Sequence, residues 1–200
     1  MPYHKYLSEF LGAFTLTFVA WVSTVYGVPA NVTHMMVAAT LGLYVYTVGG
    51  ISGAHLNPAV TIGVLSAGKI KTNDAVMYVI FQLAGAVVAM TAGRFLSGGQ
   101  MAALGYDLSA GAGIAEAIGA FILAFGVMSA TLQKIPPAAS GIVVGGSLFI
   151  GLYASFQFSN GILNPAVALG LNAFGPMEIL GPIVGAVAGS WARVALEKKA

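Results

Sequence analysis

The tripeptide Asn-Pro-Ala occurs twice in this chain, each time inside an apolar segment, GGISGAHLNPAVTIG and GILNPAVALG. The two copies are Asn57, Pro58 and Ala59 and then Asn164, Pro165 and Ala166. The offset between the copies (164 − 57) equals the offset between Glu9 and Glu116 (116 − 9), which lie in the similar frames SEFLGAFTLTF and AEAIGAFILAF. Two matches at one offset indicate an internal duplication. We expect one domain built from repeat one, about residues 1–107, and repeat two, about residues 108–200.

The composition restricts the class of protein. Of the 200 residues, 58% are hydrophobic and only 7% are charged, whereas about 25% of a soluble domain is charged. The chain is therefore expected to be an integral membrane protein. A net charge of +2, carried by so few groups, gives no basis for a nucleic-acid partner. The absence of cysteine excludes disulfides and thiolate metal sites.

Six apolar segments are long enough to approach the length of a membrane-spanning helix, which needs about 20 residues. They are residues 6–26, 35–48, 75–96, 113–132, 141–156 and 179–196. Two shorter apolar segments, 58–67 and 165–174, begin within the tripeptides. A helix of that length is roughly 15 Å long, about half of the ~30 Å hydrocarbon core. We expect these two segments to be half-helices that enter the membrane without crossing it.

The basic residues predict the orientation. With the N-terminus inside, the inner segments carry Lys5, Lys69, Lys71, Lys134, Arg193, Lys198 and Lys199, and only Arg94 falls outside, as the positive-inside rule requires. Three spans per repeat is an odd number, so the second repeat must be inverted relative to the first. The half-helices then enter from opposite sides and their N-termini meet near the midplane. We expect a multi-pass protein of the plasma membrane with both termini cytoplasmic.

The tripeptide has the chemistry of a helix start, because asparagine is a strong N-cap and proline suits the first helical position. Helix N-termini carry partial positive charge, and asparagine amides donate hydrogen bonds. The non-helical segments before the tripeptides, 52–56 and 159–163, are tolerated at membrane depth only if they are covered by protein or line a watery path. The pattern therefore predicts a passive channel that admits neutral hydrogen-bonding molecules and repels cations, including protons.

The chain resembles the aquaporin / major intrinsic protein family over nearly its whole length. The motifs that carry the resemblance are SEFLGAF, SGAHLNPAVTIG, AEAIGAF, LNPAVALG and GPIVGAVAG. The resemblance implies an all-α membrane fold, with six transmembrane helices and two half-helices in two inverted repeats. It also implies a homotetramer with a pore in every monomer, in which Asn57 and Asn164 face the pore. The other residues that it places along the pore or its vestibules are Gly53, Ala54, His55, Asn160 and Ile162.

The chain departs from the family pattern at the selectivity filter. The family usually has an arginine three residues after the second asparagine, and that position is Val167. Counting as in the family, the other filter positions are Val37 (57 − 20), Leu152 (164 − 12) and the carbonyl of Gly161, with a shift of one helical turn left open for Val37 and Leu152. The loss of a guanidinium removes a charge and up to five donors. We expect an apolar filter that passes water at an ordinary or reduced rate, together with ammonia, urea or hydrogen peroxide.

The titratable residues favour structural roles. Glu9 and Glu116 are acids within apolar spans, which is costly, and each is expected to accept hydrogen bonds from the irregular segment of its own repeat. His4 and His34 are expected near the membrane surfaces, away from His55, so we expect no metal site and no cofactor. No nucleophile–base pair is visible in the sequence, and an enzyme is not expected.

Three alternatives remain open from the sequence. A glycerol or small-polyol facilitator belongs to the same class and differs only in its solute. An alternating-access transporter also uses inverted repeats and broken helices, but it needs a midplane ion site, and the only acids expected within the spans are Glu9 and Glu116. A non-conducting structural membrane protein could use the same fold with a closed pore.

Overall fold

The computed structural model describes residues 3–197, so Lys198 and Lys199 of the charge count lie outside the described residues. Within this range every regular element is an α-helix, which confirms the all-α fold. The helices are α1 (Tyr3–Val25), α2 (Ala30–Ser52), α3 (Pro58–Ser66), α4 (Thr72–Leu96), α5 (Ala110–Thr131), α6 (Pro137–Phe156), α7 (Pro165–Gly170) and α8 (Pro176–Glu197). Six of them, all except α3 and α7, are long and apolar enough to cross a membrane.

The expected spans are confirmed in number, but their boundaries are wrong. The six spanning helices all begin before the expected residue, and α2 has 23 residues where the apolar segment 35–48 has 14. Hydropathy does not detect most of the first turns because they contain polar residues that are still helical, and in α5 the missed residues are alanine and glycine. The second half-helix is shorter than the expected 165–174. It ends at Gly170, and Asn172 then adopts a left-handed conformation with φ 55°, which a continuing helix cannot contain.

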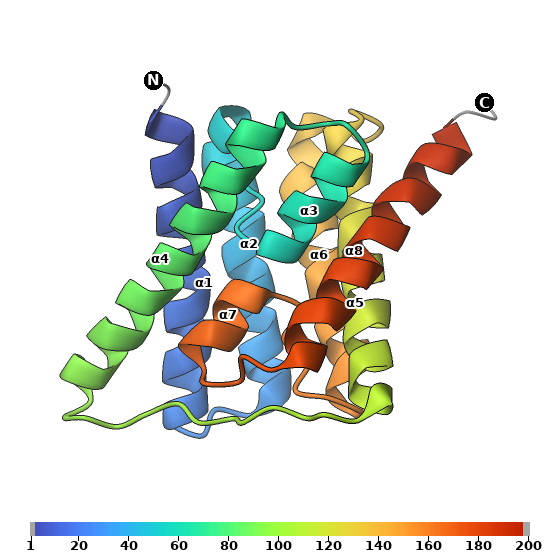
Figure 1. Cartoon of the computed structure of the whole chain (residues 1–200). Helices are drawn as coiled ribbons and strands as arrows, with labels where there is room; N and C mark the ends of the chain where they lie inside the picture. Colours follow the sequence, from blue (N-terminus) through green and yellow to red (C-terminus); the bar gives the residue numbers. More distant parts are fainter. Residues whose placement is uncertain (1–2, 198–200) are drawn as a thin grey trace.

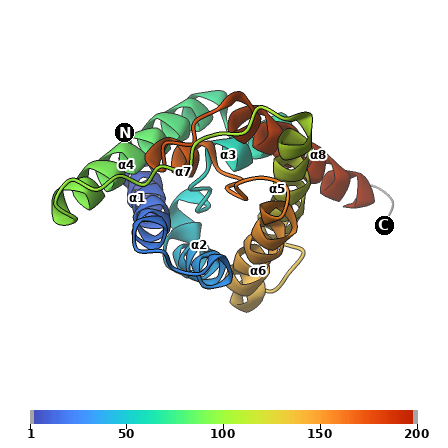
Figure 2. The same ribbon diagram turned by 90° about the horizontal axis from the view of Figure 1, so that it is seen from below.

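The six spanning helices surround the two half-helices. Helices α1 and α8 have their terminal ends at the same edge of the molecule, which we call the termini side (Figure 1). Helix α3 lies in the half nearer this side and α7 in the half nearer the opposite side, with their N-terminal ends toward each other. Viewed along the spans, α3 and α7 lie within the ring of longer helices (Figure 2). This is the arrangement of two inverted repeats that the sequence predicted.

Glycines bring the helix backbones into contact. A Cβ atom built on Gly145 of α6 would lie 2.7 Å from the carbonyl oxygen of Ala38 in α2, and one on Gly63 of α3 would lie 2.7 Å from that of Ala186 in α8. Real side chains do not approach carbonyl oxygens so closely, so only glycine permits this packing. Close contact through small residues is the usual way in which helices associate in a membrane. Here it attaches the half-helix α3 firmly to a spanning helix.

Two adjacent glycines of α6 allow a matched test of this packing. We expect Gly145→Ala to lower the free energy of unfolding by about 1–3 kcal/mol, because the new methyl group overpacks the α2–α6 contact. Gly146 has no atom within 4 Å of its hypothetical Cβ. Gly146→Ala is therefore expected to be neutral or stabilising by up to about 1 kcal/mol, since alanine favours a helix. Denaturant unfolding in detergent measures both, and equal effects would contradict the packing argument.

Candidate functional site

The two asparagines of the tripeptides are joined across the repeats. Asn57 is the N-cap of α3: its Oδ1 accepts a hydrogen bond from the backbone N–H of Ala59 at 2.8 Å, and its Nδ2 donates to the carbonyl of Leu163 at 2.8 Å. Asn164 caps α7 in the same way. Its Oδ1 accepts from the N–H of Ala166 at 3.0 Å, and its Nδ2 donates to the carbonyl of Leu56 at 3.0 Å. Each half therefore holds the backbone of the other immediately before its half-helix begins.

The segments before the tripeptides have a left-handed backbone at equivalent positions. Ala54 and Leu56 have φ of 50° and 51°, and their counterparts in repeat two, Gly161 and Leu163, have φ of 60° and 57°. A non-glycine residue in this region costs roughly 1–2 kcal/mol, so the surrounding contacts must stabilise it. The side chains of Leu56 and Leu163 pack against Gly12 and Gly119, where a Cβ would overlap them. These glycines are themselves equivalent, from the two GAF motifs.

A buried glutamate holds each of these segments. Glu9 is fully buried, and its Oε1 accepts hydrogen bonds from the hydroxyl of Ser52 at 2.6 Å and the N–H of His55 at 3.0 Å. Its Oε2 accepts from the N–H of Leu56 at 2.6 Å and from Nε2 of Gln82 at 2.7 Å. A carboxylate buried in protein is tolerated when its acceptor sites are filled in this manner.

Glu116, also fully buried, repeats the arrangement in the second half. Its Oε1 accepts from the hydroxyl of Ser159 at 2.8 Å and the N–H of Ile162 at 3.1 Å, and its Oε2 accepts from the N–H of Leu163 at 2.7 Å. All three donors stand at the positions of repeat two that correspond to donors of Glu9 in repeat one. The duplication thus extends from the sequence to the individual hydrogen bonds.

The first half carries additional polar contacts that the second half lacks. The Nε2 of Gln82 also donates to Oγ1 of Thr61 at 3.0 Å, and Nδ1 of His55 lies 3.2 Å from the same oxygen. The position of repeat two that corresponds to Thr61 is Ala168. Gln82 corresponds to Pro182, because Gly85 and Gly185 pack against the equivalent carbonyls of Phe10 and Ala117, and neither position has a polar side chain. His55 is therefore held through its ring as well as its backbone, and it is not free to change orientation.

A cavity of about 380 Å³ lies between the asparagine pair and the opposite side. All four expected filter residues line it, and so do both asparagines and the two expected neighbours of Gly161. In order along the chain these lining residues are Val37, Asn57, Leu152, Asn160, Gly161, Ile162, Asn164 and Val167. Pro58, Ala59, Pro165 and Ala166 are buried in the first turns of the half-helices and line neither this cavity nor the one on the termini side.

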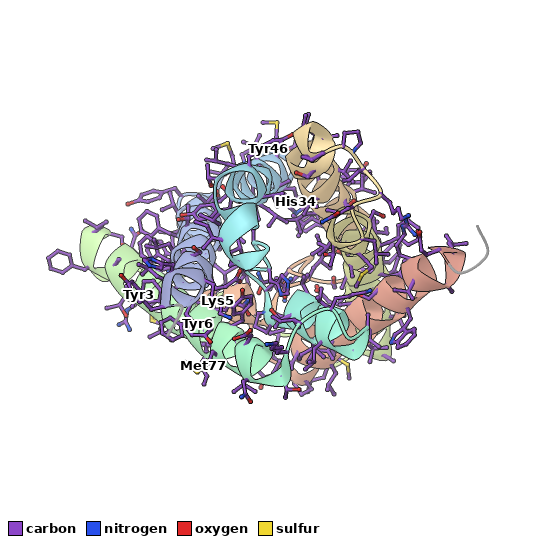
Figure 3. The ribbon with its side chains drawn as sticks, turned by 90° about the horizontal axis from the view of Figure 1, so that it is seen from above. Tyr3, Lys5, Tyr6, His34, Tyr46 and Met77 are labelled. Carbon is purple, nitrogen blue, oxygen red and sulfur yellow. The ribbon has the colours of Figure 1, made fainter. Side chains whose placement is uncertain are left out.

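A second cavity of about 800 Å³ lies on the termini side, and Gly53, Ala54 and His55 line it. His55 and Val127 line both cavities, so the two spaces are neighbours at these residues, beside the asparagine pair. The view from the termini side places His34 at the inner side of the ring of helices, whereas Met77 lies at its periphery (Figure 3). The two cavities together mark a route along the axis of the molecule.

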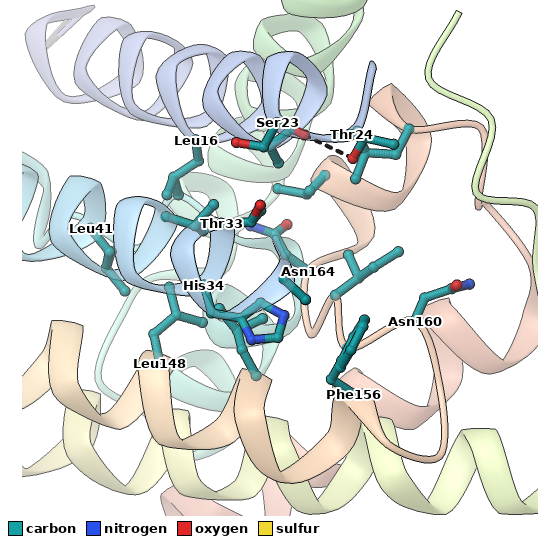
Figure 4. Close-up of a pocket in the computed structure, with 18 of the residues that line it drawn as sticks. Leu16, Ser23, Thr24, Thr33, His34, Leu41, Leu148, Phe156, Asn160 and Asn164 are labelled. Carbon is teal, nitrogen blue, oxygen red and sulfur yellow. Dashed lines mark hydrogen bonds between the residues drawn. The ribbon is translucent and has the colours of Figure 1, made fainter. Parts of the chain in front are cut away.

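Facing residues of α2 and α6 line part of the opposite-side cavity. We call the part lined by Val37, Leu152, Leu41 and Leu148 the neck. These helices are antiparallel, and the ring centroids of His34 and Phe156 lie 5.1 Å apart. One turn further in, the same register sets Val37 level with Leu152, and the next turn sets Leu41 level with Leu148; all of these residues line the cavity. The neck is therefore apolar over two helical turns, and the close-up view labels Leu41 and Leu148 of its inner level (Figure 4). Val167 of α7 also lines the cavity.

Two buried polar residues were not singled out from the sequence. His34, in the second turn of α2, is 6% exposed and lines the opposite-side cavity. Glu178, in the first turn of α8, is a third buried acid, whereas only Glu9 and Glu116 were expected within the spans. Its Oε1 accepts from the N–H of Asp107 at 2.9 Å and from Nδ2 of Asn160 at 3.2 Å. The sequence contained one signal for His34, because this residue lies three positions before Val37 and therefore on the same face of the helix.

The comparison with protein families decides the identity. The model of the family described as major intrinsic protein matches residues 2–193. The chain belongs to the major intrinsic protein family. Aquaporin NIP1-4 of Oryza sativa subsp. japonica is 35% identical over 202 residues, which cover 93% of this chain and 74% of that protein. Glycerol uptake facilitator protein-like 6 of Lactiplantibacillus plantarum is 34% identical over 206 residues, which cover 92% and 93%.

A solved structure agrees with the fold of this major intrinsic protein. The X-ray structure of the aquaglyceroporin from Plasmodium falciparum has a TM-score of 0.65 and 21% sequence identity, covering 99% of this chain and 96% of that one. Major intrinsic proteins are channels and not enzymes, so the family assigns this multi-pass membrane protein to the passive channels.

The glutamate contacts yield a stability prediction. We expect Glu116→Ala to lower the free energy of unfolding by about 2 kcal/mol or more, because the buried N–H groups of Ile162 and Leu163 lose their acceptor, at about 1–3 kcal/mol each. The control is Glu197→Ala, which removes ion pairs with Lys134 and Arg193 from a glutamate side chain that is 33% exposed. Its cost should stay below about 1 kcal/mol. Denaturant unfolding in detergent compares them, and a small effect of Glu116→Ala would show that other contacts hold the segment.

Proposed function

We propose that this protein is a passive channel for water and for small neutral solutes such as ammonia, urea and hydrogen peroxide, and that it excludes ions and protons. One observation carries the proposal: two cavities on opposite sides of the molecule share lining residues beside a pair of asparagines that are joined across inverted repeats. In this proposal Val37, Leu152, Gly161 and Val167 form the filter.

The asparagine pair supports selection for neutral hydrogen-bonding molecules. Each amide nitrogen has two N–H groups, and the bond to the opposite carbonyl uses one of them. The other can donate to a molecule in the cavity that Asn57 and Asn164 line. The first turns of α3 and α7 direct their free N–H groups to the same region, and such helix ends carry partial positive charge that falls off within a turn. A cation is repelled where a water oxygen is bound.

The apolar neck supports exclusion of ions of either sign. An ion that loses its hydration without compensation faces a cost of order tens of kcal/mol in a low-dielectric medium. A neutral solute loses only a few hydrogen bonds, each worth about 0.5–1.5 kcal/mol net. Val37, Leu152 and Val167 offer an ion no compensating charge. Discrimination against ions therefore does not require the arginine that this chain lacks.

A glycerol or small-polyol facilitator is the second candidate, since one of the similar proteins is named as a glycerol uptake facilitator. Glycerol carries three hydroxyls that must be desolvated together, and the side chain of Val167 offers no donor to them. We therefore propose water, and neutral solutes smaller than glycerol, as the main molecules that the channel conducts. The buried Glu178 does not favour an alternating-access transporter, because its hydrogen bonds fix the connection between α4 and α5 and the segment before α7.

The assembly and orientation of the channel are also part of the proposal. We propose a homotetramer in the plasma membrane with cytoplasmic termini. Lys5 and Lys134 lie on the termini side, together with Lys69 and Arg193, which agrees with the positive-inside rule for that orientation. The boundary between the repeats is proposed near residue 107, within the connection from α4 to α5.

Reconstitution into proteoliposomes tests the function. We expect stopped-flow light scattering to show osmotic water permeability several-fold above that of empty liposomes, with measurable urea uptake and no increase in proton flux. Water permeability equal to that of empty liposomes would reject the channel. Glycerol uptake faster than urea uptake would instead favour the polyol facilitator.

The filter position Val167 provides a second test. It is 5% exposed and lines the opposite-side cavity, so Val167→Trp is expected to fill the cavity and reduce water permeability at least tenfold, roughly to the background of empty liposomes. The matched control is Val184→Trp on the outer face of α8, where the valine is 62% exposed. That variant should keep the permeability of the unmodified protein. Conduction through the Val167→Trp variant would place the water path elsewhere.

A further inference from the structure

His34 is a polar group in the opposite-side cavity to which the proposed function assigns no role. It lies in the second turn of α2, is 6% exposed, and lines the cavity. Its Nδ1 has no hydrogen-bond partner among the described residues. A buried polar atom without a partner costs about 1–3 kcal/mol. The other ring nitrogen, Nε2, is not enclosed in this way and makes no hydrogen bond with the described residues, so it is the nitrogen that a molecule in the cavity can reach.

The ring of His34 is held by packing. The aromatic ring of Phe156 meets it edge to face, with centroids 5.1 Å apart and planes at 75°. The two side chains come from α2 and α6 and lie on the same side of the cavity in the close-up view (Figure 4). Phe156 thus fixes the orientation of the imidazole without occupying Nε2, which remains open to the cavity.

His34 stands at a distinct level of the route. It precedes Val37 by one turn of α2, which corresponds to about 4.5 Å along the helix, and it belongs to none of the four filter positions. Other polar residues, Ser23, Thr24, Thr33 and Asn160, also line the cavity. Toward the midplane, two apolar levels of α2 and α6 separate His34 from the asparagine pair. The imidazole is thus a polar side chain one helical turn from the start of the apolar neck.

We propose that His34 is a specificity-determining residue that binds neutral solutes at the entrance of the apolar neck. A neutral imidazole has one donor and one acceptor nitrogen. It therefore suits small molecules that can both donate and accept, such as water and urea, and it replaces a hydrogen bond that the solute loses on entering the neck. This inference rests on the proposed function, because it names the residue that selects solutes in the same channel.

Two substitutions of similar size separate hydrogen bonding from shape. His34→Leu keeps the bulk of the side chain but extends the apolar neck by one level. We expect it to lower osmotic water permeability about fivefold, the effect of one lost hydrogen bond of about 1 kcal/mol. His34→Gln keeps a donor and an acceptor, so its water permeability should remain within about twofold of that of the unmodified protein. A twofold change corresponds to a free energy smaller than that of one hydrogen bond. His4→Leu, at an exposed histidine of α1, is the matched control and should change nothing.

The experiment uses full-length protein in proteoliposomes at equal protein density, and denaturant unfolding of each variant in detergent. Equal permeability of the His34→Leu variant and the unmodified protein would overturn the proposal while leaving the channel function intact. Equal losses in the Leu and Gln variants would also overturn it, since they would indicate a role in packing. If the unmodified protein itself were no more permeable than empty liposomes to water or urea, both the channel function and this inference would be rejected.

Discussion

Two crossed hydrogen bonds hold the centre of this molecule together, from the amide of Asn57 to the carbonyl of Leu163 and from Asn164 to the carbonyl of Leu56. Each bond needs a backbone carbonyl that would accept a hydrogen bond within the helix if the segment were helical. The segment before each half-helix must therefore be non-helical. The left-handed residues accomplish this at an energetic cost, and the carboxylate of Glu9 or Glu116 offsets it by binding the freed N–H groups. The crossed hydrogen bonds, the left-handed residues and the buried glutamates therefore depend on one another.

Much of this arrangement was predictable from the duplication. The common offset of the tripeptides and the glutamates, with an odd number of spans per repeat, requires inverted halves, and the paired tripeptides require two helix starts that meet. Hydropathy could not locate the helix ends, because the first turns of α2 and α6 are helical without being uniformly apolar. The length of α7 depends on the left-handed turn at Asn172, whose side chain donates to the carbonyl of Ala102 from a distant segment.

The roles of His34 and Glu178 depend on packing that a single sequence does not reveal. His34 is three residues before a position that was expected in the cavity, yet only the register between α2 and α6, set by the close approach of Gly42 and Gly145, shows that it shares the same face of the route. Glu178 lies before the apolar segment of α8, and its burial follows from the connection that crosses the opposite side. In both cases a contact between distant elements decides whether a residue is buried.

The crossed bonds also bear on how such a chain can arise. Neither half supplies the acceptor for the amide nitrogen of its own asparagine, so a polypeptide of half this length would complete the pair only by meeting a second copy inserted in the opposite orientation. Association of that kind weakens as the copies are diluted in the bilayer. Joining them by the connection between α4 and α5 makes the encounter intramolecular, with an effective concentration set by the linker. Fusion of the two halves would thus have made their pairing independent of expression level. It would also have allowed the cavity on each side of the molecule to change its lining residues separately.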